Sequence, residues 1–581
     1  MKKPTFFLLI ATIGFISSNY SQTWQWARTG GSTDNMGTNE IHRERVRSVA
    51  TDLNNNVYML ASVGLYNLKV AGITKTSYNE FPGQTDIALA KFDCRGNYKW
   101  SRIIGGRNSE DMTRVFTDTL GNVYASGRAH RVTAQYPVKF GGEGLTETDT
   151  ILPHDNVVHK RNLFLVKYDS IGNMKWLRMP QPENISFTEA SSQSFGLDLH
   201  VEPNGNSHWY VRISPGTYAD GAYTHSGTEP GLFILKYDAE GNFLGAVPLP
   251  VYMTGQAINE VKMTYDRILR RYYLTGTVNH FTPNEQVIFN GQAVTGSFFI
   301  AAFSENGNLI WWKQNTHIRW GTAMAKNVTV DNQGFIYLTG GSDNTDTFNG
   351  TAFPTASGDR FPFLLKLNPD GSTAWMTNAN TNSYGAGHAV TINGDEVAIT
   401  SGYGSMQWDN YSLLIQANSG YDAYVARFNK NTGAALGLHS LESSFGSTDF
   451  GNSITADQSG NYIIGGEFSY RIIVDGQAYL NPGQQTDFFV AKLGTSCDAL
   501  STDKVSLTPS LRAYPNPTTG IINLTLPIDG DYVLYNSLGV LIQQGTLHGD
   551  NKIDISGQPI GIYLLNLSTH EFSQTIKIVK D

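Results

Sequence analysis

The sequence has few cysteines, few charged residues and no apolar run long enough to span a membrane. Only two of its 581 residues are cysteine, and they do not form a CxxC pair. Charged residues make up 16% of the chain, the formal net charge is -8, and no basic block is present. Proteins that bind nucleic acid usually carry a basic patch, so nucleic acid is not an expected partner.

Familiar catalytic motifs are also absent from the sequence. The chain has no HExxH motif, no Walker A loop and no GxSxG elbow. Repeated aspartates such as Asp52, Asp118, Asp331 and Asp457 are turn formers first, so no carboxylate pair can be assigned to acid–base chemistry. The sequence therefore indicates no cofactor and no defined activity.

One apolar run stands at the N-terminus. A positive start, Met1-Lys2-Lys3, precedes FFLLIATIGFI (Phe6 to Ile16) and the small polar residues that follow it. This pattern predicts a signal peptide over residues 1–22. The alternative, a membrane helix, is disfavoured because the run is too short to cross a bilayer. No cysteine follows the run, so lipid attachment is not indicated there. No other stretch approaches transmembrane length.

The rest of the chain, almost to residue 500, is a repeat first seen complete from Val46 to Gly106. Two pairs of short apolar runs are each joined by an Asn/Gly/Asp turn, as in VRSVATDLNNNVYMLAS and DIALAKFDCRGNYKW. Runs of this length, rich in β-branched and aromatic residues, predict strands. Four antiparallel strands repeated in this way predict the blades of a β-propeller.

Seven copies of the first strand pair can be aligned, but the seventh copy of the second pair stops short at DFFVAKLG. The missing strand is supplied by TWQWARTGG at Thr23 to Gly31, which overlays YKWSRIIGG at Tyr98 to Gly106. We therefore expect a seven-bladed propeller over residues 23–496, closed by its N-terminal strand, which would protect the sheet edges. Tryptophans recur at one blade position, which favours packing between sheets over an exposed sugar-binding role: Trp26, Trp100, Trp176, Trp311 and Trp375.

An insertion between the second and third strands of each repeat has its own signature. It reads as an apolar run, Asn/Asp-Gly and a further apolar residue, for example VIFNGQAV at Val287 and IIVDGQAY at Ile472. This is the pattern of a tight hairpin. All seven hairpins should emerge on one face of the propeller, which would carry most of the variable surface.

These repeats resemble the SBBP family of bacterial β-propeller repeats. The shared features are the D-x-x-G-N-x-Y turn and the following segment that ends in tryptophan. Two repeats depart from the pattern with Gly245 and Gly437 near the tryptophan position, and one lacks the turn glycine at Arg267 to Leu269. The resemblance implies a fold and no defined activity.

The character of the chain changes near its end. Residues 497–512 are polar and aperiodic, and predict a linker. Residues 513–581 contain short alternating strands with Pro-Asn-Pro and glycine turns, which predict a small Ig-like β-sandwich.

This tail resembles the type A C-terminal sorting domain of the type IX secretion system. The resemblance implies that the secretion machinery is a partner, that the protein is exported across the outer membrane, and that it stays on the cell surface or is released. The alternative is an ordinary C-terminal Ig-like domain. The matching residues are Tyr514, Pro515, Asn516, Pro517, Gly520, Gly539, Gly561, Tyr563, Lys577 and Lys580.

The two cysteines follow the third strand of the first and last repeats. A closed ring would make those repeats neighbours, and export to an oxidising place allows a disulfide between Cys94 and Cys497. Equivalent points on adjacent blades can exceed the Cα distance that a disulfide spans, so two free thiols remain the alternative.

Other candidate sites have simpler explanations. Residues Asp52 to Asn56 alternate oxygen ligands as a calcium loop does, but lack its glycine and final glutamate, and are better explained as a turn. A metal site and solvated loop histidines are both compatible with His130, His154, Asp155 and His159. An acidic partner and a solvated hairpin end are both compatible with Arg267, Arg270 and Arg271.

Two functions remain after these exclusions. The favoured one is a non-enzymatic, exported binding or adhesion module that presents its hairpin face to an unidentified glycan or protein. The alternative is a secreted hydrolase or lyase whose site lies at the mouth of the central channel. A pocket there with two or three facing carboxylates or histidines would favour the enzyme.

Overall fold

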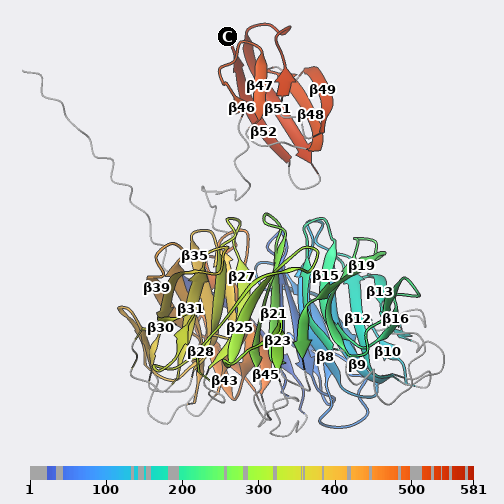
Figure 1. Ribbon diagram of the computed structural model, residues 1–581, viewed down its shortest axis with the longest axis vertical. Coiled ribbons are helices and arrows are strands. Elements are labelled where there is room, and N and C mark those ends of the chain that lie inside the picture. The colour runs from blue at the N-terminus through green and yellow to red at the C-terminus, as the bar shows by residue number, and fades with distance from the viewer. Residues whose placement is uncertain are drawn as a thin grey trace, which may run out of the picture.

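The computed structural model describes most of the chain from Gln22 onwards, and every regular element in the described part is a β-strand (Figure 1). The described residues are 22–33, 43–132, 136–141, 150–151, 159–180, 195–253, 258–278, 286–317, 323–354, 356, 360–381, 385–414, 420–443, 448–481, 486–497, 513–524, 529–537, 540–548, 552–569 and 573–581. The proposed signal peptide up to residue 21 and linker residues 498–512 lie outside this set.

Seven antiparallel sheets of like design fill the described part of residues 22–497, and each is named here by its first strand. The β2 sheet contains β2 (Val46–Thr51), β3 (Val57–Val63), β6 (Asp86–Phe92) and β7 (Tyr98–Ile104). The β8 sheet contains β8 (Glu110–Thr117), β9 (Val123–Val132), β12 (His159–Tyr168) and β13 (Met174–Arg178). The β14 sheet contains β14 (Phe195–Val201), β15 (Ser207–Ile213), β18 (Gly231–Tyr237) and β19 (Phe243–Leu249).

The next three sheets repeat the same order of four strands. The β21 sheet contains β21 (Ile258–Asp266), β22 (Arg271–Val278), β25 (Phe298–Ser304) and β26 (Leu309–Gln314). The β27 sheet contains β27 (Met324–Val330), β28 (Ile336–Ser342), β31 (Phe361–Leu367) and β32 (Thr373–Asn378). The β34 sheet contains β34 (Ala389–Asn393), β35 (Glu396–Tyr403), β38 (Asp422–Asn429) and β39 (Ala435–Ser440).

The last sheet joins the two ends of this region. The β41 sheet contains β41 (Phe450–Ala456), β42 (Tyr462–Phe468), β45 (Asp487–Gly494) and, as its fourth strand, β1 (Thr23–Gly31). β1 pairs antiparallel with β45 from Thr23↔Gly494 to Gly30↔Phe488, with an irregularity between Trp24 and Trp26. The N-terminal strand therefore lies where the repeat pattern lacks its last strand.

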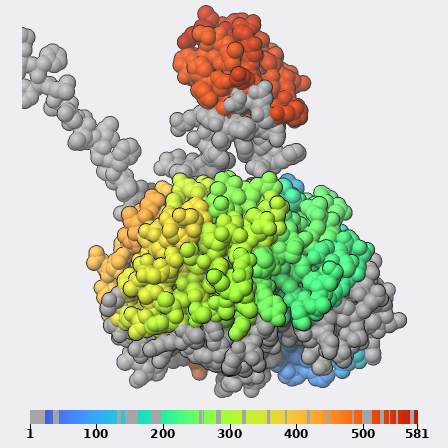
Figure 2. Space-filling model, in the orientation of Figure 1, coloured from blue at the N-terminus to red at the C-terminus, as the bar shows by residue number. Residues whose placement is uncertain are grey.

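The first strands of the seven sheets contact one another in chain order, and β41 in turn contacts β2. Middle strands such as β3, β6 and β31 are buried at every position. This continuous burial follows from packing on both faces of each sheet, and it explains why these strands are apolar at successive residues rather than alternate ones. Figure 2 shows the sheets coloured green to orange as one continuous surface.

The insertions form hairpins at one end of the sheets. Asn290 and Gly291 both have positive φ, as a two-residue hairpin turn requires, and Asp475 with Gly476 does the same. The hairpins are β4 (Lys69–Val70) with β5 (Ile73–Thr74), β10 (Val138–Lys139) with β11 (Thr150–Ile151), β16 (Gly216–Tyr218) with β17 (Tyr223–His225), β23 (Val287–Phe289) with β24 (Gln292–Ala293), β29 (Thr347–Phe348) with β30 (Thr351–Ala352), β36 (Met406–Trp408) with β37 (Tyr411–Leu413), and β43 (Arg471–Val474) with β44 (Gln477–Leu480).

We call the end with these hairpins the hairpin face, and the opposite end, where the first-to-second and third-to-fourth strand turns lie, the turn face. Several hairpins also pair with the preceding sheet. β4 pairs with the end of β1, while β23, β36 and β43 pair with the short strands β20 (Val251–Met253), β33 (Asn380–Thr381) and β40 (Glu442–Ser443). The hairpins are therefore partly structural, because they join adjacent sheets.

The tail folds as two sheets around its own core. One contains β46 (Ala513–Tyr514), β47 (Ile521–Leu524) and β50 (Lys552–Asp554). The other contains β49 (Leu541–His548), β48 (Asp529–Asn536), β51 (Gly561–Thr569) and β52 (Ser573–Lys580). Buried residues from both sheets, such as Ile522, Leu534 and Leu565, pack together.

Candidate functional site

The first strands of the seven sheets surround a cavity of about 470 Å³. This volume falls within the range of small-molecule pockets, roughly 300–1,000 Å³. Its lining includes Arg267, Ile268 and Asn332, which belong to first-to-second strand turns, so the cavity lies toward the turn face.

One wall of the cavity is aromatic and cationic. Phe116 on β8 and Tyr265 on β21 flank His200 on β14, and each ring centroid lies 5.6 Å from that of the imidazole in an edge-to-face arrangement. Arg114 stands 5.6 Å from the Phe116 ring and 3.6 Å from the buried carboxylate of Asp198. Because Asp198 also accepts hydrogen bonds from two main-chain amides, this guanidinium is held in place.

His200 is the unusual polar group of this wall. Burial, and then the charges of His208, Arg267 and Arg114, lower the pKa of His200 to about 3. The imidazole is therefore neutral near pH 7. Its Nε2 atom is buried and has no hydrogen-bond partner among the described residues.

The opposite wall carries small hydroxyl and aliphatic side chains. Thr391 on β34 and Thr455 on β41 alternate with Val390 and Ile454. The order of the first strands places β34 and β41 across the cavity from β14. The cavity thus has one stacking wall and one wall of hydroxyl groups.

The two carboxylates in the lining, Asp266 and Asp331, already hold turns. Asp266 Oδ1 accepts from the amides of Ile268 and Leu269, at 2.8 and 3.0 Å. Asp331 Oδ1 accepts from two amides of its own turn, and its Oδ2 accepts from the Tyr337 hydroxyl at 3.1 Å. Each carboxylate is therefore engaged by its own turn, and the two are not assigned as an acid–base pair.

A second histidine lies behind the cavity wall. His208 Nε2 is 2.9 Å from Glu202 Oε1, and His208 Nδ1 is 2.8 Å from the Tyr272 hydroxyl. In the β2 and β8 sheets the same positions hold an aspartate bonded to a tyrosine, as in Asp52 with Tyr58. The Glu202–His208 pair is therefore a variant of a structural turn contact.

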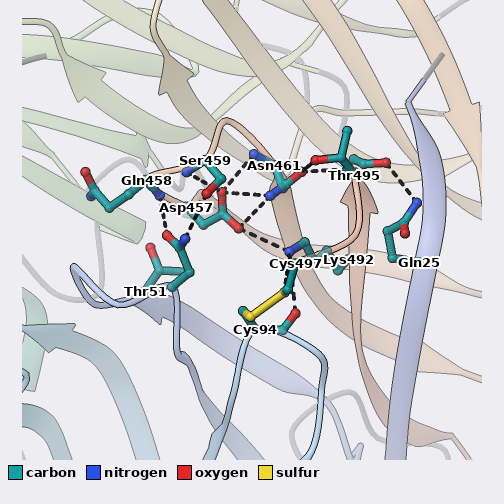
Figure 3. Close-up of polar contacts among 12 residues, drawn as sticks. Gln25, Thr51, Cys94, Asp457, Gln458, Ser459, Asn461, Lys492, Thr495 and Cys497 are labelled. Atoms are coloured by element: carbon teal, nitrogen blue, oxygen red, sulfur yellow. Dashed lines mark hydrogen bonds and ion pairs between the residues drawn. A yellow bond between two sulfur atoms is a disulfide. The ribbon is translucent and has the colours of Figure 1, made fainter. Parts of the chain in front are cut away.

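A polar cluster at the turn face joins the last sheet to the first (Figure 3). A disulfide links Cys94 to Cys497, with Cα atoms 6.0 Å apart. Beside it, Lys492 Nζ donates to the Cys94 carbonyl at 3.4 Å and lies 3.4 Å from Asp457 Oδ2. Asn55 of the first turn accepts from the Gln458 amide at 2.8 Å.

The repeated tryptophans lie between adjacent sheets. Each indole donates to a main-chain carbonyl in the next sheet, as Trp100 does to Ser170 and Trp176 to Ala239, at 3.1 and 3.0 Å. A glycine of that next turn packs on the ring, so that a Cβ at Gly172 would come within 2.8 Å of Trp100. These tryptophans serve packing rather than an exposed sugar platform.

The other sequence candidates are dispersed. His154 and Asp155 lie outside the described residues, as do the side chains of His130 and His159, although their strands β9 and β12 are paired. Within the described residues, no group of three or more His, Cys, Asp or Glu side chains could hold a metal ion. The residues Asp52 to Asn56 form a turn in which Asp52 Oδ1 accepts from the amides of Asn54 and Asn56.

The three arginines of the irregular turn have separate roles. Arg267 lines the cavity, Arg270 pairs with Glu305, and Arg271 donates to the Pro369 carbonyl of the next sheet at 3.1 Å. Arg271 thereby makes the contact that a third-strand lysine makes in other sheets, such as Lys366 to the Lys430 carbonyl. The sequence pattern did not reveal this substitution, because the arginine comes from a different strand.

The sorting-motif residues gather at the end of the terminal strand β52. The Asn516 side chain donates to the Lys577 carbonyl at 2.7 Å and accepts from the Val579 amide at 2.8 Å. The Tyr563 hydroxyl donates to the Pro559 carbonyl at 2.7 Å, and Gly520 lies against Ser556. Tyr514, Pro515 and Pro517 surround Asn516 in the sequence. Gly561 is paired with Lys580 across β51 and β52, and Gly539 lies outside the described residues.

The hairpin face carries the exposed aromatic side chains of the repeat region. Among its described residues, every exposed tyrosine and phenylalanine lies on this face, with exposed fractions of 41% to 54%. The exposed large side chains in the turns of the opposite face are instead aliphatic, such as Leu120 and Ile171. The aromatic residues are Tyr66, Phe81, Tyr252, Tyr411 and Tyr470.

Comparison with known proteins identifies the tail. Residues 512–581 match the secretion system C-terminal sorting domain. Within residues 22–497 and the tail, no described helix is long and apolar enough to cross a membrane. The chain is similar to an uncharacterized WD repeat-containing protein of Acanthamoeba polyphaga mimivirus, with 22% identity in an alignment of 458 residues that covers 66% of this chain and 31% of the relative. The chain thus spans about a third of the length of that relative.

Solved structures with a similar arrangement are distant in sequence. A quinohemoprotein alcohol dehydrogenase from Comamonas testosteroni is 12% identical, with a TM-score of 0.33 and coverage of 81% of this chain and 76% of that one. A polysaccharide lyase, described as an ulvan lyase, is 11% identical, with a TM-score of 0.36 and coverage of 80% and 96%.

Proposed function

We propose that this protein is an exported, non-enzymatic binding module whose hairpin face contacts an extracellular glycan or protein. The sorting domain marks it for export through the type IX secretion system, to the cell surface or into the medium. The proposal divides the chain into a signal peptide (1–22), a seven-bladed β-propeller of SBBP-type repeats (23–496), a linker (497–512) and an Ig-like sorting domain (513–581).

The propeller part of this proposal is supported by the contacts of the first strands. They follow chain order and end with β41 against β2, as the blades of a ring would. β1 occupies the fourth-strand position of the β41 sheet, so that all seven sheets have the same four strands.

The observation that carries the binding proposal is the unequal distribution of exposed aromatic side chains. Tyrosine is enriched at recognition surfaces because it offers a large apolar ring together with a hydroxyl group. Five tyrosine and phenylalanine side chains on the hairpin face are at least 41% exposed. The turn face offers aliphatic side chains instead.

The position of the linker agrees with this assignment. β45 ends at Gly494, and Cys497 is bonded to a third-to-fourth strand turn, so the chain leaves the repeat region from the turn face. Attachment or processing at the tail would therefore leave the hairpin face accessible.

The test compares the two faces on the full mature chain. Glycan and protein arrays are probed with the native protein, with a variant in which Tyr252, Tyr411 and Tyr470 are replaced by Ala, and with a control in which Leu53, Leu120 and Ile171 are replaced by Ala. We expect the tyrosine variant to lose at least tenfold in affinity for any ligand found, and the control to bind normally. Equal binding by both variants would rule out the hairpin face.

The alternative function is a hydrolase or lyase acting in the channel cavity. The observation that favours it is the channel cavity itself, which the neutral His200 lines. A hydrolase and lyase screen run beside the arrays decides between the functions, because turnover that is lost in His200→Phe would support the enzyme.

A further inference from the structure

The channel cavity combines features that single out one class of ligand, independently of the hairpin face. Its volume of about 470 Å³ is sufficient for one or two sugar rings but not for a folded partner. Pockets for small molecules are mostly apolar, with a few placed polar groups that fix the orientation of the ligand. The lining of this cavity is more polar than that, because charged and hydroxyl side chains stand beside its aromatic and aliphatic ones.

The aromatic wall offers an apolar surface. Phe116, His200 and Tyr265 come from three successive first strands, β8, β14 and β21, and the His200 ring contacts each of the other two edge to face. Tyr265 is fixed from behind by His208 and Tyr272, whose ring centroids lie 4.5 and 4.9 Å away. A wall fixed in this way can receive the flat, CH-rich face of a ring without rearranging.

The polar groups around this wall suit hydroxyl groups. The imidazole of His200 lines the same wall, but its Nε2 atom is buried beyond the reach of a ligand. Arg114 supplies a donor from the same wall, and its side chain is 23% exposed. Thr391 and Thr455, across the cavity, carry hydroxyls that both donate and accept. The lining carries both signs of charge, since Arg114 and Arg267 are accompanied by Asp266 and Asp331.

We infer that the channel cavity binds a polyhydroxylated ring, a sugar residue, with its apolar face on Phe116 and Tyr265 and its hydroxyls on Arg114 and the opposite threonines. The site takes either a free sugar or the terminal residue of a glycan, which share this chemistry.

The test uses saturation-transfer NMR and calorimetry on the full mature chain. The probes are glucose, galactose and mannose, their methyl glycosides, and cyclohexanol, which has the same ring size but a single hydroxyl. We expect at least one sugar to bind with a Kd of millimolar or better, and cyclohexanol to bind at least tenfold more weakly. Equal affinity for a sugar and its methyl glycoside assigns the site to a glycan terminus. Binding of the sugar without binding of its methyl glycoside assigns the site to a free sugar.

Two variants locate the binding. Thr391→Phe fills the cavity from the other wall and should abolish binding, while Tyr411→Ala on the hairpin face should leave it unchanged. Thermal unfolding confirms that each variant is folded. The proposal fails if no probe sugar binds the native protein, or if folded Thr391→Phe binds sugar as well as the native chain does.

Discussion

Two junctions between neighbouring sheets can be compared directly, one where the chain is continuous and one where it is not. Between the β2 and β8 sheets, Trp100 donates to the Ser170 carbonyl and Arg102 to the Gly172 carbonyl, at 3.1 and 2.8 Å. Between the β41 and β2 sheets, Trp26 donates to the Cys94 carbonyl and Arg28 to the Gly96 carbonyl, at 3.0 and 2.7 Å. The same set of contacts therefore occurs at both.

The likeness extends to the first strands. The Val115 amide donates to Ser48 Oγ at the continuous junction, and the Val49 amide donates to Ser453 Oγ at the other, both at 3.1 Å. What differs is the covalent path, because residues 403 apart in sequence are joined there only by a disulfide. The comparison teaches that the repeat supplies the contacts of a junction, while β1 and the disulfide replace the missing chain connection.

Removing β1 should have the largest effect on this comparison. A mature chain that begins after residue 31 loses the β1–β45 pairing, the Trp26 contacts and the cover over an edge strand. We expect loss of cooperative unfolding and aggregation, measured by thermal unfolding and light scattering. A truncated chain that remains monomeric, with an unchanged melting temperature, would contradict the role given to β1.

Replacing a single tryptophan sharpens the comparison. Trp26→Ala and Trp100→Ala remove buried rings that are 7% and 8% exposed, and each should cost about 3–5 kcal/mol of unfolding free energy. Trp26→Ala should cost more when the disulfide is reduced, because β1 is then held by pairing alone, whereas Trp100→Ala should not. Denaturant unfolding with and without reductant measures both. Equal sensitivity of the two variants to reductant would count against the distinction.

Replacing both Cys94 and Cys497 by Ala should destabilise the protein by about 2–4 kcal/mol, because the crosslink restricts the unfolded chain. The melting temperature of the exported protein should fall on reduction, and that of the double variant should not respond to reductant. If the melting temperature of the native protein did not change on reduction, the crosslink would contribute no stability to the junction.

A single buried acid gives the smallest expected effect. Burial raises the pKa of Asp86, beside Glu110, to about 7, and burial together with Glu44 raises the pKa of Asp487 to about 8. The folded state thus holds protons that the unfolded state releases, so this stability is complete below about pH 4 and is lost as pH rises through 7 to 8.

The free energy of unfolding should accordingly fall by on the order of 2 kcal/mol per group between pH 5 and 8. Asp86→Asn should remove the part of this fall that arises at the continuous junction, between the β2 and β8 sheets. The part that arises from Asp487 should remain. Urea unfolding at several pH values measures this. An Asp86→Asn profile that is parallel to the native one would contradict the assignment.

The sequence predicted the strand pairs, the tail and the place of Trp26, because each depends on a pattern that recurs within the chain or matches a known motif. The pairing of β23 with β20, or of β43 with β40, was missed because strands of two to four residues carry no periodicity. His200 was also missed as a cavity residue. It occupies an ordinary strand position, and only the convergence of β8, β14 and β21 brings it together with Phe116 and Tyr265.

The substituted turns show a further limit. Asp52 and Tyr58 recur as a recognisable pair, but Glu202 with His208 and Arg271 with Pro369 make comparable contacts through different residue types or strands. A repeat pattern identifies positions that share residue types, so contacts preserved by other residues become visible only in three dimensions.

The central proposal is that β1 completes the last sheet of a closed ring. Hydrogen–deuterium exchange on the exported protein tests it most directly, by comparing the peptide over Thr23–Gly31 with the one over Tyr98–Ile104. The account predicts similar protection of both, because each is the fourth strand of its sheet and pairs with the third strand. Complete exchange of the N-terminal peptide within seconds, beside a protected Tyr98–Ile104, would contradict it.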